Sequence, residues 1–220
     1  MDGKVLRALA SLNPLTLLGA FFPHKKTAIA QEKVGHGTNE ITTIPKILYK
    51  IKDLIKGAII TIDAIGTQVK IAKMIVEFEA DYLLAVKGNQ HQLHADVKLF
   101  LDSVIEGRMP HVKYTYHETL EKGHGRIEKR KIWTTDNFRW LYRKRRWKGL
   151  QTLSVIETTI IQIRKGEEQS KTITRKYYIS SLLVEAKIIL AIARNHWSIE
   201  NKNHWPLNVA HINYSQRLGG

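Results

Sequence analysis

Uninterrupted apolar runs alternate with helix-like segments in the first half of the chain. Residues 58–62 and 82–86 are almost wholly apolar, and each run ends at a polar residue, Asp63 or Lys87. Such runs are typical of strands that are covered on both faces of a sheet. Apolar residues at helical spacing follow each run. The pattern therefore predicts a β-α-β-α unit of an α/β protein over residues 58–105, with polar residues at strand ends where open sheets bind ligands.

The residues before this unit predict a hairpin and a helix. Two short apolar runs, residues 15–22 and 27–34, flank a polar turn that contains Pro23. A linker with two glycines follows. Apolar residues then recur at helical spacing over residues 40–54, so we expect one helix with Leu54 on its apolar face.

Apolar and charged residues alternate from Val112 to Ser181. Alternation at every second residue predicts antiparallel strands. The expected strands are residues 112–118, 126–133, 153–164 and 172–180. We interpret this region as a β-rich subdomain inserted into the α/β core.

The last predicted helix covers residues 184–205 and ends at Pro206. Its first half consists of strong helix formers without Gly or Pro. His196, Glu200 and His204 are four residues apart and therefore share one face. A buried amphipathic helix is the simpler interpretation of such a stretch, because tryptophans at helical spacing usually belong to a core.

The chain has 220 residues, a formal net charge of +15 and a sequence pI near 9.9. This excess favours a polyanionic partner, either nucleic acid or an anionic membrane surface. The sequence contains no apolar run of the roughly 18 residues that would span a bilayer and no recognisable export signal. The absence of cysteine excludes disulfides and thiolate zinc sites. We therefore expect a soluble protein of the cytoplasm without a membrane partner.

Three separated carboxylates, Asp2, Asp63 and Glu200, are candidate metal ligands. Mg²⁺ prefers hard oxygen ligands, and two such ions about 3.5–4 Å apart can activate a water and stabilise the leaving oxygen of a phosphodiester. The strand-end position of Asp63 strengthens the case, because a buried carboxylate at a sheet edge would otherwise be costly. Any three of 20 acidic residues are weak evidence when taken alone.

Positive charge is concentrated in residues 139–148, where Lys and Arg are interleaved with aromatic residues. A solvated basic face is the simpler interpretation, but the aromatic residues favour phosphate contacts. His124 lies between two glycines, which fits a simple turn as well as a binding role.

Seven segments occur in an order that carries more information than any one of them. They are residues 1–7 (MDGKVLR), 39–45 (NEITTIP), 61–64 (TIDA), 82–90 (YLLAVKGNQ), 122–128 (KGHGRIE), 175–182 (RKYYISSL) and 196–205 (HWSIENKNHW). Together they resemble the successive signatures of the ISAs-one, or H-repeat-associated, family of insertion-sequence transposases. The resemblance extends along nearly the full length of the chain.

The resemblance implies a DDE transposase with an α/β, ribonuclease-H-like core and a β-rich insertion before the last catalytic helix. Residues 1–110 would form the first part of the core and residues 111–182 the inserted subdomain. Residues 183–220 would form the closing part of the core, with Glu200 on its helix.

The reaction implied by the resemblance is metal-dependent cleavage at a transposon end, followed by attack of the freed 3′-hydroxyl on target DNA. Asp2, Asp63 and Glu200 would be the catalytic and metal-binding residues, with Mg²⁺ or Mn²⁺ as cofactor. The residues expected to contact DNA are Lys87, Asn89, His124, Arg126, Arg143, Arg145, Arg146, His196 and His204. The two histidines on the last helix could instead position Glu200. By analogy, we expect a homo-oligomer on DNA, associated with the nucleoid.

Two departures from the family pattern predict a truncated copy. Met1 directly precedes Asp2, and Leu207-Asn208-Val209 stands where the family has an LDV-like run. Two other functions stay open. The chain could be a DNA-binding fragment or inhibitor without catalytic activity. It could also be a hydrolase with zinc on His196, Glu200 and His204, although the HExxH spacing is absent.

Overall fold

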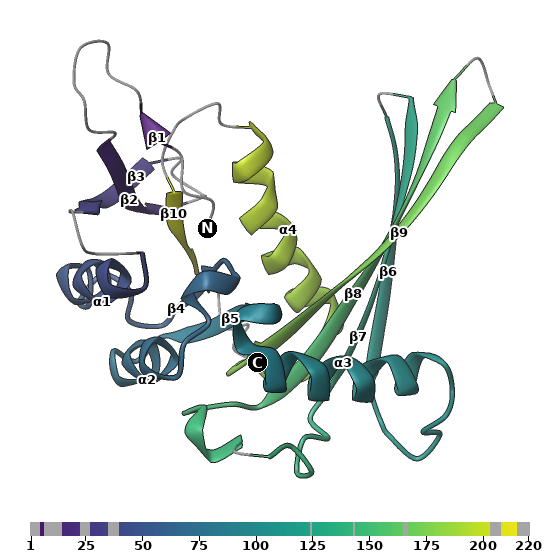
Figure 1. Ribbon diagram of the computed structural model, residues 1–220, viewed down its shortest axis with the longest axis horizontal. Coiled ribbons are helices and arrows are strands. Elements are labelled where there is room, and N and C mark those ends of the chain that lie inside the picture. Colours follow the sequence, from purple (N-terminus) through teal and green to yellow (C-terminus); the bar gives the residue numbers. More distant parts are fainter. Residues whose placement is uncertain are drawn as a thin grey trace, which may run out of the picture. The chain divides into compact units, whose positions relative to one another are not determined.

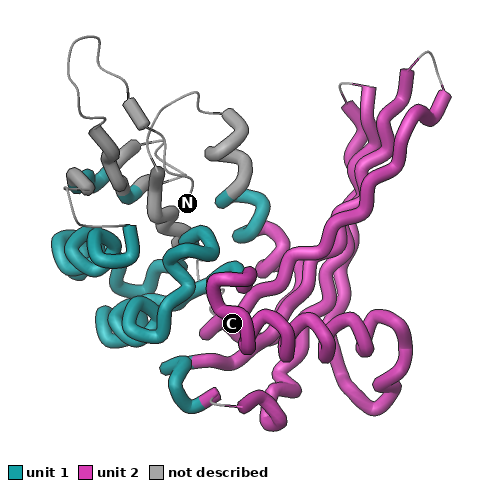
Figure 2. The backbone as a smooth tube through the Cα atoms, viewed as in Figure 1, with its two compact units in different colours: residues 1–85, 145–149, 192–220 teal, residues 86–144, 150–191 magenta. Residues whose placement is uncertain are grey.

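The structure is a computed structural model of the chain (Figure 1). It describes residues 5–6, 15–22, 27–34, 40–123, 125–142, 144–164, 167–202 and 208–214. The chain consists of two compact units (Figure 2). Residues 1–85, 145–149 and 192–220 form the first unit, and residues 86–144 and 150–191 form the second.

A mixed sheet of six strands is the framework of the first unit. Its strands are β1 (Val5–Leu6), β2 (Leu15–Phe22), β3 (Thr27–Val34), β4 (Ala58–Ile62), β5 (Asp81–Val86) and β10 (Asn208–Tyr214). They are arranged in the order β1-β2-β10-β4-β5, and β3 pairs with β2. β4 is parallel to β5, whereas β10 is parallel to β2 and antiparallel to β4.

The structure confirms the predicted hairpin and both predicted core strands. β2 and β3 pair antiparallel over most of their length. All five residues of β4 are buried, as its uninterrupted apolar pattern predicts. β10 was not predicted. Its residue His211 pairs with Phe21 on one side and Thr61 on the other, and partners so distant in sequence leave no local signal.

Two helices of the first unit contribute to its core. They are α1 (Glu40–Lys50) and α2 (Val69–Glu77), and apolar residues on one side of each helix are buried. The prediction of a single helix to Leu54 is wrong, because α1 ends four residues earlier and Leu54 is 57% exposed. The turns after α1 bury Ile51 and Ile55 instead, and hydrogen bonds to Ile51 O from the backbone N of Leu54 and Ile55 hold them.

The second unit combines one long helix with four antiparallel strands. The helix is α3 (His91–Ile105), and the strands are β6 (Thr115–Gly123), β7 (Arg126–Thr135), β8 (Thr152–Arg164) and β9 (Glu167–Ser180). Each strand pairs with the next along the chain. The alternating pattern therefore predicted the strand type correctly, although all four strands are longer than expected and β6 begins at Thr115, three residues later than predicted.

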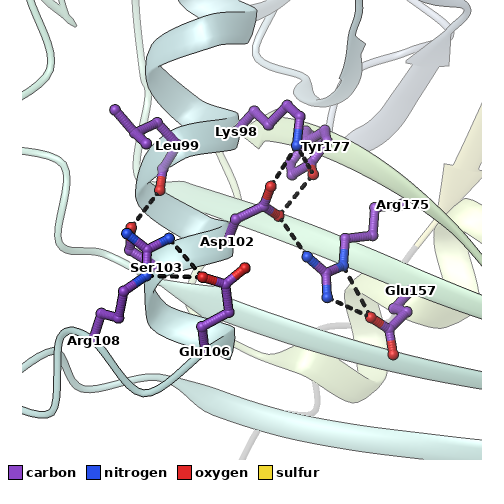
Figure 3. Close-up of polar contacts among 9 residues, drawn as sticks. All are labelled: Lys98, Leu99, Asp102, Ser103, Glu106, Arg108, Glu157, Arg175 and Tyr177. Atoms are coloured by element: carbon purple, nitrogen blue, oxygen red, sulfur yellow. Dashed lines mark hydrogen bonds and ion pairs between the residues drawn. The ribbon is translucent and has the colours of Figure 1, made fainter.

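A polar network holds α3 against β8 and β9 (Figure 3). The Asp102 carboxylate accepts hydrogen bonds from Lys98 Nζ at 2.5 Å, Tyr177 OH at 2.8 Å and Arg175 Nη1 at 3.1 Å. Arg175 also donates to Glu157 at 2.9 Å. Burial by itself would raise the pKa of Asp102, but the hydrogen bonds from Lys98 and Tyr177 and the nearby positive charges hold that pKa below its ordinary value.

The closing helix α4 (Ala186–Lys202) agrees with the predicted helix within a few residues. Residues 186–191 belong to the second unit and residues 192–202 to the first. In the part of the chain that the structure describes, no helix is both long and apolar enough to cross a membrane.

Candidate active site

Asp63 lies where the chain leaves the sheet. It directly follows β4, which is parallel to β5, so it lies at the edge formed by the carboxyl ends of these strands. Its backbone is still extended, with φ −62° and ψ 166°, and its carbonyl accepts a hydrogen bond from Gly66 N at 2.9 Å. The residue is half-buried. A carboxylate is therefore held at the kind of sheet edge where open α/β proteins bind ligands.

The turn after Asp63 is closely packed. A Cβ atom at Gly66 would lie 2.2 Å from Ile62 Cγ2, so a larger residue does not fit there without a shift of the core. Thr67 then donates a hydrogen bond from its hydroxyl to the carbonyl of Ala85 at 2.5 Å. This bond ties the segment after β4 to the end of β5. The backbone that follows Asp63 is thus anchored to β5.

A buried hydrogen bond links β4 and α4. Thr61 Oγ1 lies 3.0 Å from His196 Nδ1, and both residues belong to the first unit. The exposed fraction is 3% for Thr61 and 7% for His196. The hydroxyl donates when the imidazole carries its proton on Nε2 and accepts when the proton is on Nδ1. In either tautomer of His196, the bond holds α4 beside β4 at the position of Thr61.

This bond bears directly on two of the three predicted catalytic residues, Asp63 and Glu200. Asp63 follows Thr61 by two residues, which is about 6.6 Å along a strand. Glu200 follows His196 by four residues, which is one helical turn, or about 6 Å, on the same face. The backbone of Glu200 lies in α4, and its side chain is outside the part that the structure describes. The burial of His196 favours its positioning role over a contact with DNA.

Sequence reasoning missed Thr61. Thr61 is one polar residue in an otherwise apolar strand, and its partner, His196, is 135 residues away in the sequence. A buried threonine must find a hydrogen-bond partner, which was the only available signal.

The remaining predicted residues are distributed over the chain. Asp2, His124, Arg143 and His204 lie outside the described residues. Lys87 and Asn89 are exposed, beside and within the short turn η3 (Gly88–Gln90) that follows β5. Because they belong to the second unit and Asp63 to the first, a joint site for them stays a prediction. Within the described ranges, no group of three or more His, Asp or Glu side chains is placed to hold a metal ion.

The basic cluster at residues 139–148 has a defined local structure. Trp140 packs on Phe100 of α3 with ring centroids 4.5 Å apart, and its indole N–H donates to Asn137 O at 2.9 Å. Arg145 and Arg146 are exposed and lie in η4 (Lys144–Arg146). Both arginines are therefore available to a polyanion.

Arg126 begins β7 and is also exposed, but Glu128 is close to it. The distance from Arg126 Nη2 to the Glu128 carboxylate is 3.6 Å. Part of the charge expected to contact DNA is thus offset within the same strand.

Comparisons with known proteins agree with this arrangement. Residues 18–216 match the family model described as "Transposase DDE domain". The "H repeat-associated putative transposase YhhI" of Escherichia coli (strain K12) is 35% identical over 221 residues, which cover 95% of this chain and 55% of that protein. The "Uncharacterized protein in dhlA 3'region" of Xanthobacter autotrophicus is 43% identical over 161 residues, which cover 72% of this chain and 52% of that protein.

The chain thus spans about half the length of these curated relatives. The family match covers most of the chain, from the hairpin to β10, and it includes the strand that precedes Asp63 and the helix that contains Glu200. The family implies a ribonuclease-H-like fold, with which the mixed six-strand sheet is compatible. The predicted resemblance is confirmed: this chain belongs to the DDE transposase family and is similar to its H-repeat-associated members.

Proposed function

We propose that this chain takes part in DNA transposition as a metal-dependent enzyme that cleaves the ends of an insertion sequence and transfers them to target DNA. The observation that carries the proposal is the buried hydrogen bond between Thr61 and His196. It holds the helix with Glu200 beside the strand that leads to Asp63. Carboxylates from separate elements, brought to one sheet edge, are what such chemistry requires.

We further propose that the mixed sheet belongs to a ribonuclease-H-like core formed by residues 1–110 and 183–220. The four antiparallel strands, within residues 111–182, would be an insertion into that core. The change from the fully buried strand β4 to long antiparallel strands that are exposed along only part of their length supports this division.

The donor set fits a divalent metal. Asp63 offers a half-buried oxygen ligand, and Asp2 and Glu200 would complete an all-oxygen set of the kind that Mg²⁺ and Mn²⁺ prefer. When bound, two such ions would activate a water and stabilise the leaving oxygen of the phosphodiester. The protein itself contributes position: Gly66 and Thr67 fix the backbone after Asp63, and His196 fixes α4.

The DNA would be held by basic and polar residues outside this carboxylate set. We assign this role to the exposed residues Lys87, Asn89, Arg145 and Arg146, together with His124, Arg143 and His204. Arg126 is not included, because Glu128 offsets its charge. The net charge of +15 supports a polyanionic substrate.

The test is calorimetric titration with Mn²⁺, followed by cleavage of a labelled duplex that carries a transposon end. Asp63→Asn and Glu200→Gln should abolish Mn²⁺ binding and cleavage while duplex binding persists. Asp53→Asn is the matched control, because Asp53 is an exposed aspartate of the same unit. If the parent chain binds duplex but its Mn²⁺ titration equals that of Asp63→Asn, a non-catalytic DNA-binding protein or inhibitor is the better description.

A further inference from the structure

The distal half of the four-stranded sheet extends past the helix that covers its other half. Figure 1 shows the β6–β7 and β8–β9 hairpins continuing beyond α3. We call residues 119–123, 126–130, 158–164 and 167–174 the arm. Every residue of β9 from Glu167 to Thr174 is exposed. In the arm, the charge and the exposure of the two sheet faces can therefore be compared.

The strand register assigns the side chains of the arm to two faces. Directly paired residues share a face, and successive residues alternate between faces. Tyr177 and Arg175 contact Asp102, so they define the face on which α3 lies. Three rows of the arm continue this α3 face: Ile173, Thr159, Lys129 and Leu120, then Lys171, Ile161, Ile127 and Lys122, and finally Ile163 and Glu168.

The opposite face of the arm neutralises its own charge. Arg130 pairs with Glu121 at 3.1 Å and with Glu128 at 2.5 Å, and Arg126 lies 3.6 Å from Glu128. The side chains of Arg130 and Glu128 are only 11% and 14% exposed. These arginines are thus committed to partners within the sheet.

Two lysines on the α3 face of the arm lack such compensation. Lys122 and Lys171 are exposed, and neither has an ion-pair partner among the residues that the structure describes. Lys129 is close to Glu118, at 3.3 Å, and remains partly exposed. Two aliphatic side chains lie on the same face, Leu120 at 60% and Ile173 at 55% exposure. This face is both basic and aliphatic.

We propose that the α3 face of the arm, through Lys122, Lys129 and Lys171, binds the sugar–phosphate backbone of duplex DNA, and that the opposite face does not. This inference rests on the proposed function, since it assigns a surface to the DNA substrate. Lysine ammonium groups suit phosphates, and aliphatic side chains suit deoxyribose and thymine methyl groups.

The spacing of the lysines agrees with a duplex. Lys122 is on β6 and Lys171 on β9, three strand spacings apart, or about 14 Å at the backbone. The major groove of B-DNA is about 12 Å wide, so the two lysines can reach phosphates on both of its sides. A second copy of the chain fits less well, because two such faces in contact would bring like charges together.

The experiment compares two double variants that remove the same charge from opposite faces. Lys122→Gln with Lys171→Gln alters the α3 face. Arg126→Gln with Lys176→Gln alters the opposite face, where both side chains are also exposed. Binding to a fluorescein-labelled transposon-end duplex is followed by anisotropy between 50 and 200 mM NaCl. Thermal unfolding of each variant shows that its fold is retained.

The α3-face variant should lower the slope of log K against log salt by about 1.8, because each lost phosphate contact contributes about 0.9. Between 50 and 200 mM NaCl, the affinity of this variant for the duplex should therefore fall by about tenfold less than that of the parent. The control should keep the parent slope. Equal losses in both variants, or no loss in either, would overturn the proposal.

Two further results separate this proposal from others. If the parent shows no salt-dependent DNA binding at all, the proposed function itself fails. If the lysine variants keep the parent slope while Leu120→Ser with Ile173→Ser lowers the mass measured by light scattering without DNA, the face joins two copies of the chain and the proposal is wrong.

Discussion

Thr61 and His196 meet in the interior of the first unit, with 3.0 Å between Oγ1 and Nδ1. One residue belongs to the strand that leads to Asp63 and the other to the helix that contains Glu200. Because neither side chain reaches the surface, the contact holds the two elements together. It is the feature on which the assignment of a DDE site in this chain depends.

Loss of this bond should impair catalysis more than DNA binding. Thr61→Val keeps the side-chain volume but leaves Nδ1 of a buried imidazole without its partner, which should lower the free energy of unfolding by about 1–3 kcal/mol. The rate of end cleavage should fall while the dissociation constant for duplex changes little. Thermal unfolding, single-turnover cleavage and anisotropy measure the three quantities.

A double-mutant cycle with His196→Ala separates the bond from general damage to the core. The coupling energy between the two substitutions should be about 0.5–1.5 kcal/mol. Strictly additive effects on stability and cleavage would mean that the two residues act independently.

Gly66 should not tolerate alanine. The added Cβ would lie 2.2 Å from Ile62 Cγ2, so the core next to Asp63 must shift, at a cost of about 1–3 kcal/mol in the free energy of unfolding. Gly88→Ala is the matched control, because no heavy atom lies within 4 Å of a Cβ built there. Urea denaturation of both variants tests this, and equal stability of the two would contradict it.

The Asp102 network should stabilise the protein above the ordinary pKa of a carboxyl and lose this effect in acid. The pKa of Asp102 in the folded state lies below the ordinary pKa of an aspartate, so its contribution is complete above that ordinary pKa and falls as the pH drops through the folded pKa. Asp102→Asn should therefore lower the free energy of unfolding by about 1–3 kcal/mol at pH 7 and by much less near pH 2.

Asp96→Asn on the same helix is the control for this effect, because the nearest partner of Asp96 is Gln92, at 2.8 Å. Denaturation at several pH values should show a pH-dependent difference for Asp102→Asn and a small, constant difference for Asp96→Asn. A constant deficit for Asp102→Asn down to pH 2 would show that charge at this position does not stabilise the fold.

Local patterns in the sequence predicted most of the fold. The apolar run before Asp63 and the alternation in β6–β9 each reflect how a strand is buried, and this pattern can be read from the residues of that strand alone. The end of α1 was wrong because Leu54 fits the helical spacing, whereas the chain turns before it and buries Ile51 and Ile55.

Features that depend on distant partners could not be predicted. β10 pairs with β2 and β4, and Thr61 binds a residue in the last helix. The face of Arg126 also follows only from the strand register, which places it opposite Gln162 and near Glu128. For the site, the sequence indicated Asp63 and Glu200 through their signatures, but the bond that holds their elements together required the structure.

Iron(II)-directed cleavage of the polypeptide tests most directly whether Asp63 and Glu200 bind a common metal. Fe²⁺ bound in place of Mg²⁺ would, with ascorbate and peroxide, cut the backbone near its ligands, and mass spectrometry locates the cuts. We predict cuts next to Asp63 and next to Glu200, both of which disappear in Asp63→Asn and persist in Asp53→Asn. Cuts near Glu200 that are unchanged in Asp63→Asn, or the absence of cuts at both positions, would contradict a shared DDE site.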